Sequence, residues 1–361
     1  MIYGDIDAVS GGYLYNRKLV AYLREQGEQV TIISLPQRSY WRHLTDNFSN
    51  DCLQTIINAN IEILIEDAMV HPSLLWLNRR ISRELAIPLI ALVHLLTSYE
   101  QHPVYLGWFY RAIERRYLQS VNGFIANSRT TLNQLQTVLA GQLASHCIAV
   151  PAGDNFVEAQ IERSIIEQRT QMLGPLRILV VGNVIRRKGL HVLIKALQQL
   201  PRHQFQLTVA GRLDMEADYV QQLQAQIQVA GLQQAIVFQG VVEGEALASF
   251  YQQHQLMVLA SGYESYGIVY VEAQQFGLPV IGTTAGAAHE IITDGKNGFL
   301  IAPEDWQALA GLLQQLQNNR QELLAISLNA LAAYRQFPNW ANSCQLIRQY
   351  LYAVSRTELP I

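Results

Sequence analysis

Cysteine is scarce in this sequence: there are three, and they stand far apart, at Cys52, Cys147 and Cys344. They show neither the paired spacing of a zinc site nor the even number of a disulfide framework. The sequence therefore predicts no structural metal and three reduced thiols, which pack as small apolar side chains in a reducing compartment.

Long apolar runs are missing as well. No run reaches the ~18 residues that a membrane-spanning helix requires. The first residues, Met1 to Asp7, also lack the basic and apolar regions of a signal peptide. We therefore expect a cytoplasmic protein whose membrane contact is at most peripheral, at the inner face of the membrane.

An excess of charge of one sign is also absent. Charged residues make up 15% of the chain and the net charge is -3, which gives no overall attraction to nucleic acid. The 50% of hydrophobic residues indicates a globular protein. Its 361 residues exceed what one hydrophobic core usually supports, so two domains are expected.

Short β-branched runs alternate with longer amphipathic stretches, a pattern typical of parallel strands joined by crossover helices. Helices are expected between the strands, for example at 13–26 and 105–120. The strands fall into a first series at 30–35, 61–66, 87–94, 123–127 and 146–150, and a second at 177–181, 205–210, 235–239, 256–260, 279–282 and 298–301. The pattern predicts two doubly wound, Rossmann-like α/β domains in tandem.

Proline and glycine separate the two series, first at 151–154 and again at 174–175. The sequence thus predicts an N-terminal domain at 1–152, a linker at 153–175 and a C-terminal domain at 176–338. Only three residues precede the first loop, whereas a strand usually has about five. Either three suffice or the biological start lies upstream.

The most informative segment, 261–273, follows the strand at 256–260 and opens a helix. Glu264 lies in its loop, and Glu272 is about two turns further along the helix. Three amides are expected to be free at the helix N-terminus, where the dipole favours an anion, those of Tyr266, Gly267 and Ile268. A nucleotide sugar needs carboxylates for its hydroxyls and amides for its diphosphate. The alternative is a helix cap beside a solvated charge.

A second segment leads from the strand at 177–181 through Gly182 to a basic pair just before a helix. Glycine lets the backbone approach a ligand. Arg187 offers a planar fork and Lys188 a compact charge, and together they would neutralise a leaving diphosphate. The alternative is a basic surface cluster that includes Arg186.

A third segment, 7–13, places a Gly-Gly turn between a strand end and a helix. Dinucleotide-binding loops begin similarly, but the expected third glycine and the later acidic residue are not clearly present. Asp5 and Asp7 superficially resemble a metal-binding motif, yet no further metal ligand accompanies them. Neither a metal nor a cofactor is expected.

These three segments together resemble the retaining glycosyltransferases of family 4, in the glycosyl transferases group 1, over nearly the whole chain. The resemblance implies the GT-B architecture, with two Rossmann-like domains facing across a cleft and a C-terminal helix, 339–361, that packs back on the first. Ala285 departs from the family, which has a glycine there, and is expected to constrain its loop slightly. The resemblance is densest at 182–189, 209–212, 238–240, 264–272, 277–281 and 285–290.

The resemblance implies a retaining, metal-independent glycosyltransferase of the hexosyltransferase type. Such an enzyme moves a sugar from a nucleoside-diphosphate sugar to an acceptor hydroxyl. Arg187 and Lys188 would bind the donor phosphates, Glu264 the sugar hydroxyls and Glu272 the ribose. Further donor contacts are expected at Gly182, Tyr266, Gly267 and Ile268 and, for the base, at the backbone near Val242.

In the first domain the resemblance implies that Gly12 contacts the donor phosphate and that His94 faces the reacting sugar. The alternative for His94 is a core histidine whose hydrogen bonds the backbone satisfies. Asp67, His71 and Glu100 follow strand ends in this domain and are acceptor-side candidates. Loop capping and ordinary surface polarity explain them equally well. The acceptor alcohol itself, a sugar, a lipid-linked sugar or a small molecule, stays open.

Basic residues gather on two helices of the first domain, as in family members that sit on anionic membranes. A solvated helix face is favoured here, because Glu84 and Glu114 dilute the charge and no strong amphipathic anchor is evident. The arginines are Arg79, Arg80 and Arg83, and then Arg111, Arg115 and Arg116.

Three other functions remain open from the sequence. A sugar-nucleotide epimerase shares the architecture but would release no nucleotide to an alcohol acceptor. A dinucleotide-dependent oxidoreductase would require the glycine fingerprint that is incomplete here. A non-catalytic sugar-nucleotide-binding protein would bind the donor without turnover.

Overall fold

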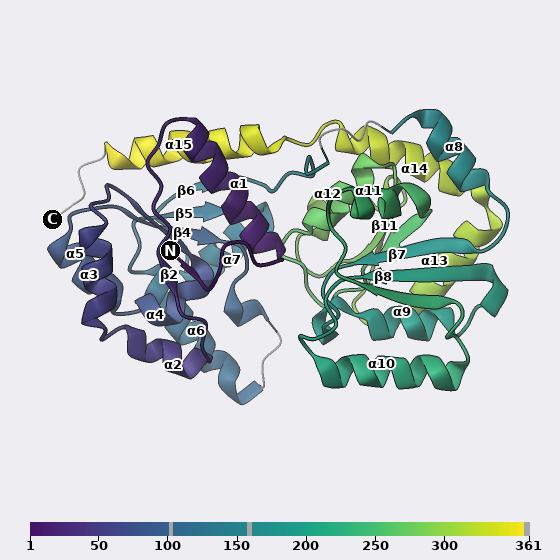
Figure 1. The fold of residues 1–361 in the computed structure, drawn as a ribbon, viewed down its shortest axis with the longest axis horizontal. Helices are drawn as coiled ribbons and strands as arrows, with labels where there is room; N and C mark the ends of the chain where they lie inside the picture. Colours follow the sequence, from purple (N-terminus) through teal and green to yellow (C-terminus); the bar gives the residue numbers. More distant parts are fainter. Residues whose placement is uncertain (101–103, 157–160, 357–361) are drawn as a thin grey trace. The chain divides into compact units, whose positions relative to one another are not determined.

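The computed structural model describes residues 1–100, 104–156 and 161–356. The chain divides into two compact units. The first comprises Met1–Pro151 together with the segment that starts at Pro338, and the second comprises Ala152–Phe337. Each unit holds a parallel sheet between two layers of helices (Figure 1).

The second unit is built on one six-stranded parallel sheet. Its strands are β7 (Leu176–Val181), β8 (Phe205–Ala210), β9 (Ile236–Gly240), β10 (Leu256–Val258), β11 (Val280–Thr283) and β12 (Gly298–Ile301). They lie in the order β12-β11-β10-β7-β8-β9, so the chain reverses its direction of travel between β7 and β10. In doubly wound sheets ligands bind at this switch point, beyond the carboxyl ends of the strands.

Helices cover both faces of this sheet, which is why its central strands are continuous apolar runs (Figure 1). One face carries α9 (Leu190–Leu197), α10 (Ala217–Ala230) and α13 (Trp306–Asn318). The other carries α8 (Arg163–Gln171), α11 (Gly244–Gln253), α12 (Ile268–Gln275) and α14 (Arg320–Tyr334).

The segment 153–175, for which the sequence predicts a linker, contains α8 and lies within the second unit. This helix packs against α14. Its Arg169 side chain is buried and donates hydrogen bonds to the carbonyls of Tyr251, Phe276 and Gly277. These bonds use the two terminal nitrogens of the buried guanidinium and fix α8 to the unit, a role that glycine and proline at the ends of the segment do not reveal.

The first unit is built on β3 (Leu64–Asp67), β4 (Leu89–Val93), β5 (Gly123–Ala126) and β6 (Ser145–Ile148), all parallel and paired in that order. A pair of short strands, β1 (Ile2–Tyr3) and β2 (Ser34–Leu35), lies beside β3, because the Asp67 amide donates to the Met1 carbonyl at 3.0 Å. The strand predicted at 30–35 shrinks to β2, since β1 offers it only two residues to pair with.

Helices also cover both faces of the first sheet (Figure 1). One face carries α1 (Gly11–Glu25) and, against it, the C-terminal helix α15 (Trp340–Ser355). The opposite face carries α2 (Tyr40–Asp46), α3 (Asn50–Asn58), α4 (His71–Leu74), α5 (Leu77–Glu84), α6 (Val104–Leu118) and α7 (Arg129–Val138), the last of which packs on β5.

Two hydrogen bonds of one tyrosine attach α15 to this sheet. The Tyr350 hydroxyl donates to the Ser145 carbonyl at 2.8 Å and accepts from the Phe124 amide at 3.1 Å.

Among the described residues, no helix has the length and hydropathy needed to cross a bilayer.

Glu66, on β3, is a carboxyl group in the core of the first unit. It is fully buried, and Asn78 Nδ2 donates to its Oε2 at 3.1 Å. Burial raises the pKa of Glu66 to about 7 against the partial compensation of that hydrogen bond. At neutral pH Glu66 is therefore only partly ionised in the native fold, and below it the protonated carboxylic acid predominates.

Glu66 makes the stability of the protein depend on pH. The pKa of Glu66 is higher in the folded than in the unfolded state. The contribution of Glu66 to the free energy of unfolding is therefore fully present below about pH 4.5 and is lost as the pH rises through about 7. We expect the free energy of unfolding, measured with urea, to fall between these values by up to about 3 kcal/mol on account of this group. Glu66→Gln should flatten that fall, whereas the exposed control Glu62→Gln should not; equal slopes for Glu66→Gln and the wild type would contradict the prediction.

Candidate functional site

An ion pair lies at the switch point of the second sheet. Lys188 ends the short 3-10 helix η3 (Arg186–Lys188) after β7, and Glu264 lies in the loop after the neighbouring strand β10. Lys188 Nζ is 2.6 Å from Glu264 Oε1, and Arg187 Nη1 is 3.7 Å from the same oxygen. The Ser261 hydroxyl also donates to that oxygen, at 2.7 Å. The sheet thus brings together three residues that the sequence places at strand ends.

The pair is largely withdrawn from solvent, with Glu264 only 6% exposed. Burial opposes ionisation of Glu264, but Lys188, Arg187 and the hydrogen bonds outweigh it and hold its pKa below the ordinary value. Burial also lowers the pKa of Lys188, and Glu264 offsets part of that shift. Two cations and one carboxylate leave a net positive charge, so the cluster attracts an anion.

Main-chain hydrogen bonds fix the Glu264 loop on two sides. The Glu264 amide donates to the Ala285 carbonyl at 3.2 Å, and the Ala287 amide donates to the Glu264 carbonyl at 2.8 Å. Arg187 Nη1 donates to the Tyr263 carbonyl at 2.7 Å. Ala285 is not among the residues with positive φ, so alanine fits there without the constraint expected from the missing glycine.

The N-terminus of α12 follows directly. Its N-cap, Gly267, has φ 99° and ψ 65°, and a Cβ at this position would overlap the ring of Tyr270. Only glycine combines this backbone with that close contact. The amides of Tyr266, Gly267 and Ile268 donate to no acceptor in the part of the chain that the structure describes. Free amides at a helix N-terminus favour an anion, so the binding of an anion by these three amides stays a prediction.

Glu272 lies in the second turn of α12 and is held within the unit rather than reaching outward. Asn155 Nδ2 donates to its Oε1 at 2.6 Å, and the Tyr251 hydroxyl donates to its Oε2 at 2.8 Å. The carboxylate is 6% exposed. Each carboxylate oxygen can accept two hydrogen bonds, so the bonds to Asn155 and Tyr251 do not by themselves exclude a ligand hydroxyl. Asn155 and Tyr251 were missed from the sequence, because one lies in the predicted linker and the other on a helix of mixed composition.

Two predicted donor residues lie at the same edge of the sheet. Gly182 directly follows β7, where a Cβ would be 3.7 Å from Cε of Lys188, so it flanks the lysine stem. Val242 follows β9, which β8 separates from β7. Val242 is therefore farther along the edge and makes no recorded contact with the Lys188–Glu264 pair.

The first unit has its own polar cluster beyond the ends of β3 and β4. His94 Nε2 is 3.0 Å from Asn16 Oδ1, and Asn16 Nδ2 donates to Asp67 Oδ2 at 2.8 Å. Gly12 lies in the first turn of α1, where a Cβ would be 3.4 Å from the His94 ring. The structure thus brings together the predicted residues Gly12, Asp67 and His94, and adds Asn16, which sequence reasoning missed.

The chain of hydrogen bonds defines the tautomer of His94. An ionised Asp67 can only accept, so the Asn16 amide turns its NH₂ toward Asp67 and its carbonyl toward His94. The histidine must then carry its proton on Nε2. Burial lowers the pKa of His94 despite the opposing charge of Asp67, so the neutral ring is favoured.

The other two acceptor-side candidates, His71 and Glu100, are not hydrogen-bonded to this cluster. His71 begins α4, is 2% exposed, and bonds through Nδ1 to the Ala68 carbonyl and through Nε2 to the Tyr40 hydroxyl. Burial lowers its pKa to about 4, so it is neutral. Glu100 follows the short helix at Thr97–Tyr99 and is half-buried. Neither residue makes a recorded hydrogen bond to Asp67 or His94.

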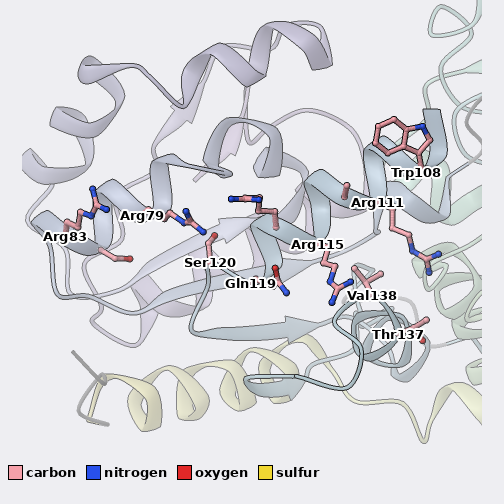
Figure 2. Close-up of a pocket in the computed structure, with 12 residues that line it drawn as sticks. Arg79, Arg83, Trp108, Arg111, Arg115, Gln119, Ser120, Thr137 and Val138 are labelled. Atoms are coloured by element: carbon pink, nitrogen blue, oxygen red, sulfur yellow. The ribbon is translucent and has the colours of Figure 1, made fainter. Parts of the chain in front are cut away.

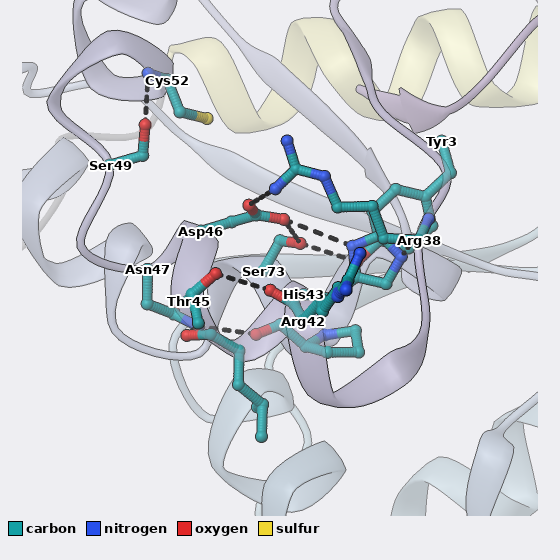
Figure 3. Close-up of polar contacts among 12 residues, drawn as sticks. Tyr3, Arg38, Arg42, His43, Thr45, Asp46, Asn47, Ser49, Cys52 and Ser73 are labelled. Carbon is teal, nitrogen blue, oxygen red and sulfur yellow. Dashed lines mark hydrogen bonds and ion pairs between the residues drawn. The ribbon is translucent and has the colours of Figure 1, made fainter.

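A buried carboxylate organises the region around α2. Asp46 accepts from Arg38 Nη1 at 3.1 Å and from the Ser73 hydroxyl at 2.8 Å, and lies 3.3 Å from His43 Nδ1 (Figure 3). Ser73 in turn bonds the Tyr3 hydroxyl at 2.7 Å. The network joins α2 and α4 to β1, and its polar groups satisfy one another.

The second unit matches a known protein family. Residues 162–332 match the family described as Glycosyl transferases group 1, a range that includes Arg187, Lys188, Glu264 and Glu272. The second unit is a group 1 glycosyl transferase domain.

Curated relatives share this domain. An uncharacterized glycosyltransferase of Methanocaldococcus jannaschii is 37% identical over 134 residues, which are 37% of this chain and 33% of the relative. A D-inositol 3-phosphate glycosyltransferase of Paenarthrobacter aurescens is 26% identical over 261 residues, 68% of this chain and 61% of the relative. The chain thus spans less than two thirds of the length of each relative.

Solved structures resemble the whole chain. HepE of Anabaena in complex with UDP and glucose has a TM-score of 0.77 at 20% identity, and the sucrose-phosphate synthase of Thermosynechococcus elongatus 0.80 at 19%. Each match covers 98% of both chains. The fold is therefore GT-B, with its two Rossmann-like units, as the sequence predicts; assignment to family 4 stays a prediction.

The Lys188–Glu264 pair should stabilise the group 1 domain. Lys188→Met leaves a buried carboxylate without its main counter-ion, and we expect a loss of about 2 kcal/mol in the free energy of unfolding at pH 7. The loss should shrink as the pH falls from 4.5, the ordinary pKa of a glutamate, through the lower pKa that Glu264 has in the folded wild type, because the carboxyl is then protonated and no longer pairs with Lys188. A double-mutant cycle with Glu264→Gln should give a coupling of at least about 1 kcal/mol; additive effects would contradict a direct interaction.

Asn16 should set the tautomer of His94. We expect nitrogen NMR of labelled protein to show the Nε2-protonated form in the wild type and a mixture of tautomers in Asn16→Leu, because leucine offers no acceptor. His191, in the other unit, serves as an internal control whose signals should not change. A wild-type His94 protonated on Nδ1 would contradict the arrangement.

Proposed function

We propose that this chain is a glycosyltransferase that moves a hexose from a nucleoside-diphosphate sugar to an acceptor hydroxyl, with retention of the anomeric configuration and without a metal ion. The observation that carries the proposal is the net positive cluster of Arg187, Lys188 and Glu264 beside the unpaired amides of α12. This cluster lies at the switch point of a domain of the glycosyl transferases group 1.

The donor diphosphate suits this end of the sheet. Arg187 and Lys188 would pair with its oxygens, and the amides of Tyr266, Gly267 and Ile268 would donate to them. Positively charged side chains and fixed amides stabilise the charge that develops as the sugar departs. They would supply the neutralisation that a divalent cation provides in other enzymes.

The carboxylates would recognise the two sugars of the donor. Glu264 is already oriented by Lys188 and Ser261, and it would accept hydrogen bonds from hydroxyls of the transferred sugar. Glu272, oriented by Asn155 and Tyr251, would accept from the ribose. Substrate binding of this kind places the anomeric carbon without any movement of the carboxylates.

Retention is proposed to occur by substitution on a single face. The bond between the anomeric carbon and the diphosphate oxygen breaks, and its electron pair stays with the diphosphate. The acceptor oxygen forms its bond from the same side, and its proton passes to an oxygen of the departing phosphate. The ion-paired Glu264 and the hydrogen-bonded Asp67 support this route, because neither is poised as a nucleophile.

The test is release of nucleoside diphosphate from a panel of UDP-, GDP- and ADP-sugars, with and without alcohol acceptors. Lys188→Met should lower kcat by about 10² to 10³, since it removes a charge that acts in the transition state. Arg187→Gln, which leaves the Lys188–Glu264 pair in place, should also lower kcat. The control Lys195→Met removes an exposed lysine of the same domain and should turn over normally.

Two further readouts test the finer proposals. Activity should persist in EDTA, and proton NMR of the product should show the anomeric configuration of the donor. Loss of activity in EDTA that Mg²⁺ or Mn²⁺ restores would contradict metal independence. An inverted product, or a trapped glycosyl-enzyme adduct, would contradict same-face substitution. Donor binding without turnover for any sugar would favour a non-catalytic binding protein.

A further inference from the structure

A groove lined by arginines runs along the first unit, outside the polar cluster of His94. It has a volume of about 1120 Å³ and lies among α5, α6 and α7. Arg79 and Arg83 enter it from α5, and Arg111 and Arg115 from α6 (Figure 2). Arg116 and Trp108, also on α6, complete its charged and aromatic lining.

No residue in the described part of the chain neutralises the charge of these five arginines. Their side chains make no recorded hydrogen bond or ion pair with another described residue, and no aspartate or glutamate lines the groove in the described part of the chain. Unpaired guanidinium groups that share one recess repel one another, which costs free energy unless an anion binds. A chain with a net charge of -3 thus concentrates positive charge in one place.

The structure changes the interpretation that Glu84 and Glu114 dilute this charge. Glu84 does not line the groove. Glu114 is on the buried side of α6, where it accepts hydrogen bonds from the amides of Thr97 and Ser98. Burial raises the pKa of Glu114 to about 7, so even this carboxyl is not fully charged at neutral pH. Neither glutamate therefore shields the arginines.

The groove is elongated. Trp108 lines it from the second turn of α6 and Gln119 from the position directly after the last residue of that helix, and their separation of eleven positions corresponds to about 16 Å of helix. Arginines four residues apart repeat along each helix, with Cβ atoms about 6 Å apart. Trp108, with 71% of its surface exposed, lies near one end. This layout matches a ligand that repeats its negative charges along its length, rather than a single small anion.

The lining favours a hydrophilic ligand over a bilayer. Helices that rest on membranes present a broad apolar face next to their cationic residues. Here Trp108 is the single large apolar side chain among the exposed residues that line the groove within the described chain. The arginines also line a recess, which a chain can enter and a flat lipid surface cannot.

We propose that this groove binds an anionic glycan, a chain of sugars that carries repeated carboxylate groups. Guanidinium forks pair with carboxylates through two parallel hydrogen bonds, and the exposed indole offers a flat surface for a sugar ring. That the chain is a carbohydrate rests on the proposed function, since a glycosyltransferase needs a hydroxyl-bearing acceptor. The groove would hold an acceptor chain away from the reacting centre and thereby select it.

The test is binding of a fluorescein-labelled oligogalacturonate, followed by fluorescence anisotropy in the absence of any donor. We expect the wild type to bind and its affinity to fall as NaCl is added. Two double variants, Arg79→Gln/Arg83→Gln and Arg111→Gln/Arg115→Gln, should each weaken binding by about tenfold. The matched control Arg335→Gln/Arg356→Gln removes two exposed arginines elsewhere and should bind normally. Circular dichroism should show all three variants folded.

Several outcomes would overturn the proposal. They are no binding by the wild type at low salt, equal binding of neutral dextran, and equal affinity of the groove variants and the control. Phosphatidylglycerol vesicles and a single-stranded oligonucleotide are tested in the same way. If either binds more tightly than the oligogalacturonate, and its binding depends on the same arginines, the proposal is overturned in favour of a membrane or of a nucleic acid. Donor hydrolysis does not require the groove. If the wild type hydrolyses no donor, the proposed function is therefore contradicted, whereas the result of the binding experiment is unaffected.

Discussion

Lys188 and Glu264 meet beyond the carboxyl ends of β7 and β10, and the chemistry proposed for this protein depends on that contact. The two strands are neighbours only because the chain crosses over at the centre of the sheet, which opens a gap between the flanking helices. A lysine and a glutamate 76 residues apart in sequence thereby share one small, poorly solvated volume. Each stabilises the charge of the other, and the arginine beside them leaves the cluster positive.

The same edge of the sheet explains why the other donor-site groups are where they are. Helix α12 begins directly after the Glu264 loop, so its free amides and the positive end of its dipole point toward the same region as the cations. The loop that contains Ala285 and Ala287 pins the backbone of Glu264 from the far side. Charge, amides and loop are thus ordered before any ligand arrives, which lowers the reorganisation that catalysis requires.

Much of this could be predicted from the sequence. The central β-strands are buried on both faces and leave long apolar signals, and the cations and carboxylates of the second unit follow such runs. The resemblance to the family supplied their roles. Asn16 could not be found in this way. It is a single amide on an amphipathic helix, and the sequence does not tell whether such a side chain faces solvent or, as here, bridges Asp67 and His94.

The errors have physical causes of the same kind. The segment at 153–175 has the glycine and proline of a linker, yet Arg169 fixes its helix by bonds to distant carbonyls. Glu114 was expected to dilute the neighbouring arginines, but two amides of another loop draw it to the buried side of α6. Which face of a charged helix is buried depends on tertiary partners, and the local sequence does not contain them.

The central claim is that the cations and amides at the end of the second sheet hold a diphosphate. A crystal structure of the protein with UDP or GDP tests it most directly. We expect the β-phosphate within hydrogen-bond distance of Lys188 and Arg187 and of the amides at Tyr266 to Ile268, with the ribose hydroxyls on Glu272. A nucleotide bound elsewhere, with the Lys188–Glu264 pair untouched and no ribose hydroxyl on Glu272, would contradict the claim.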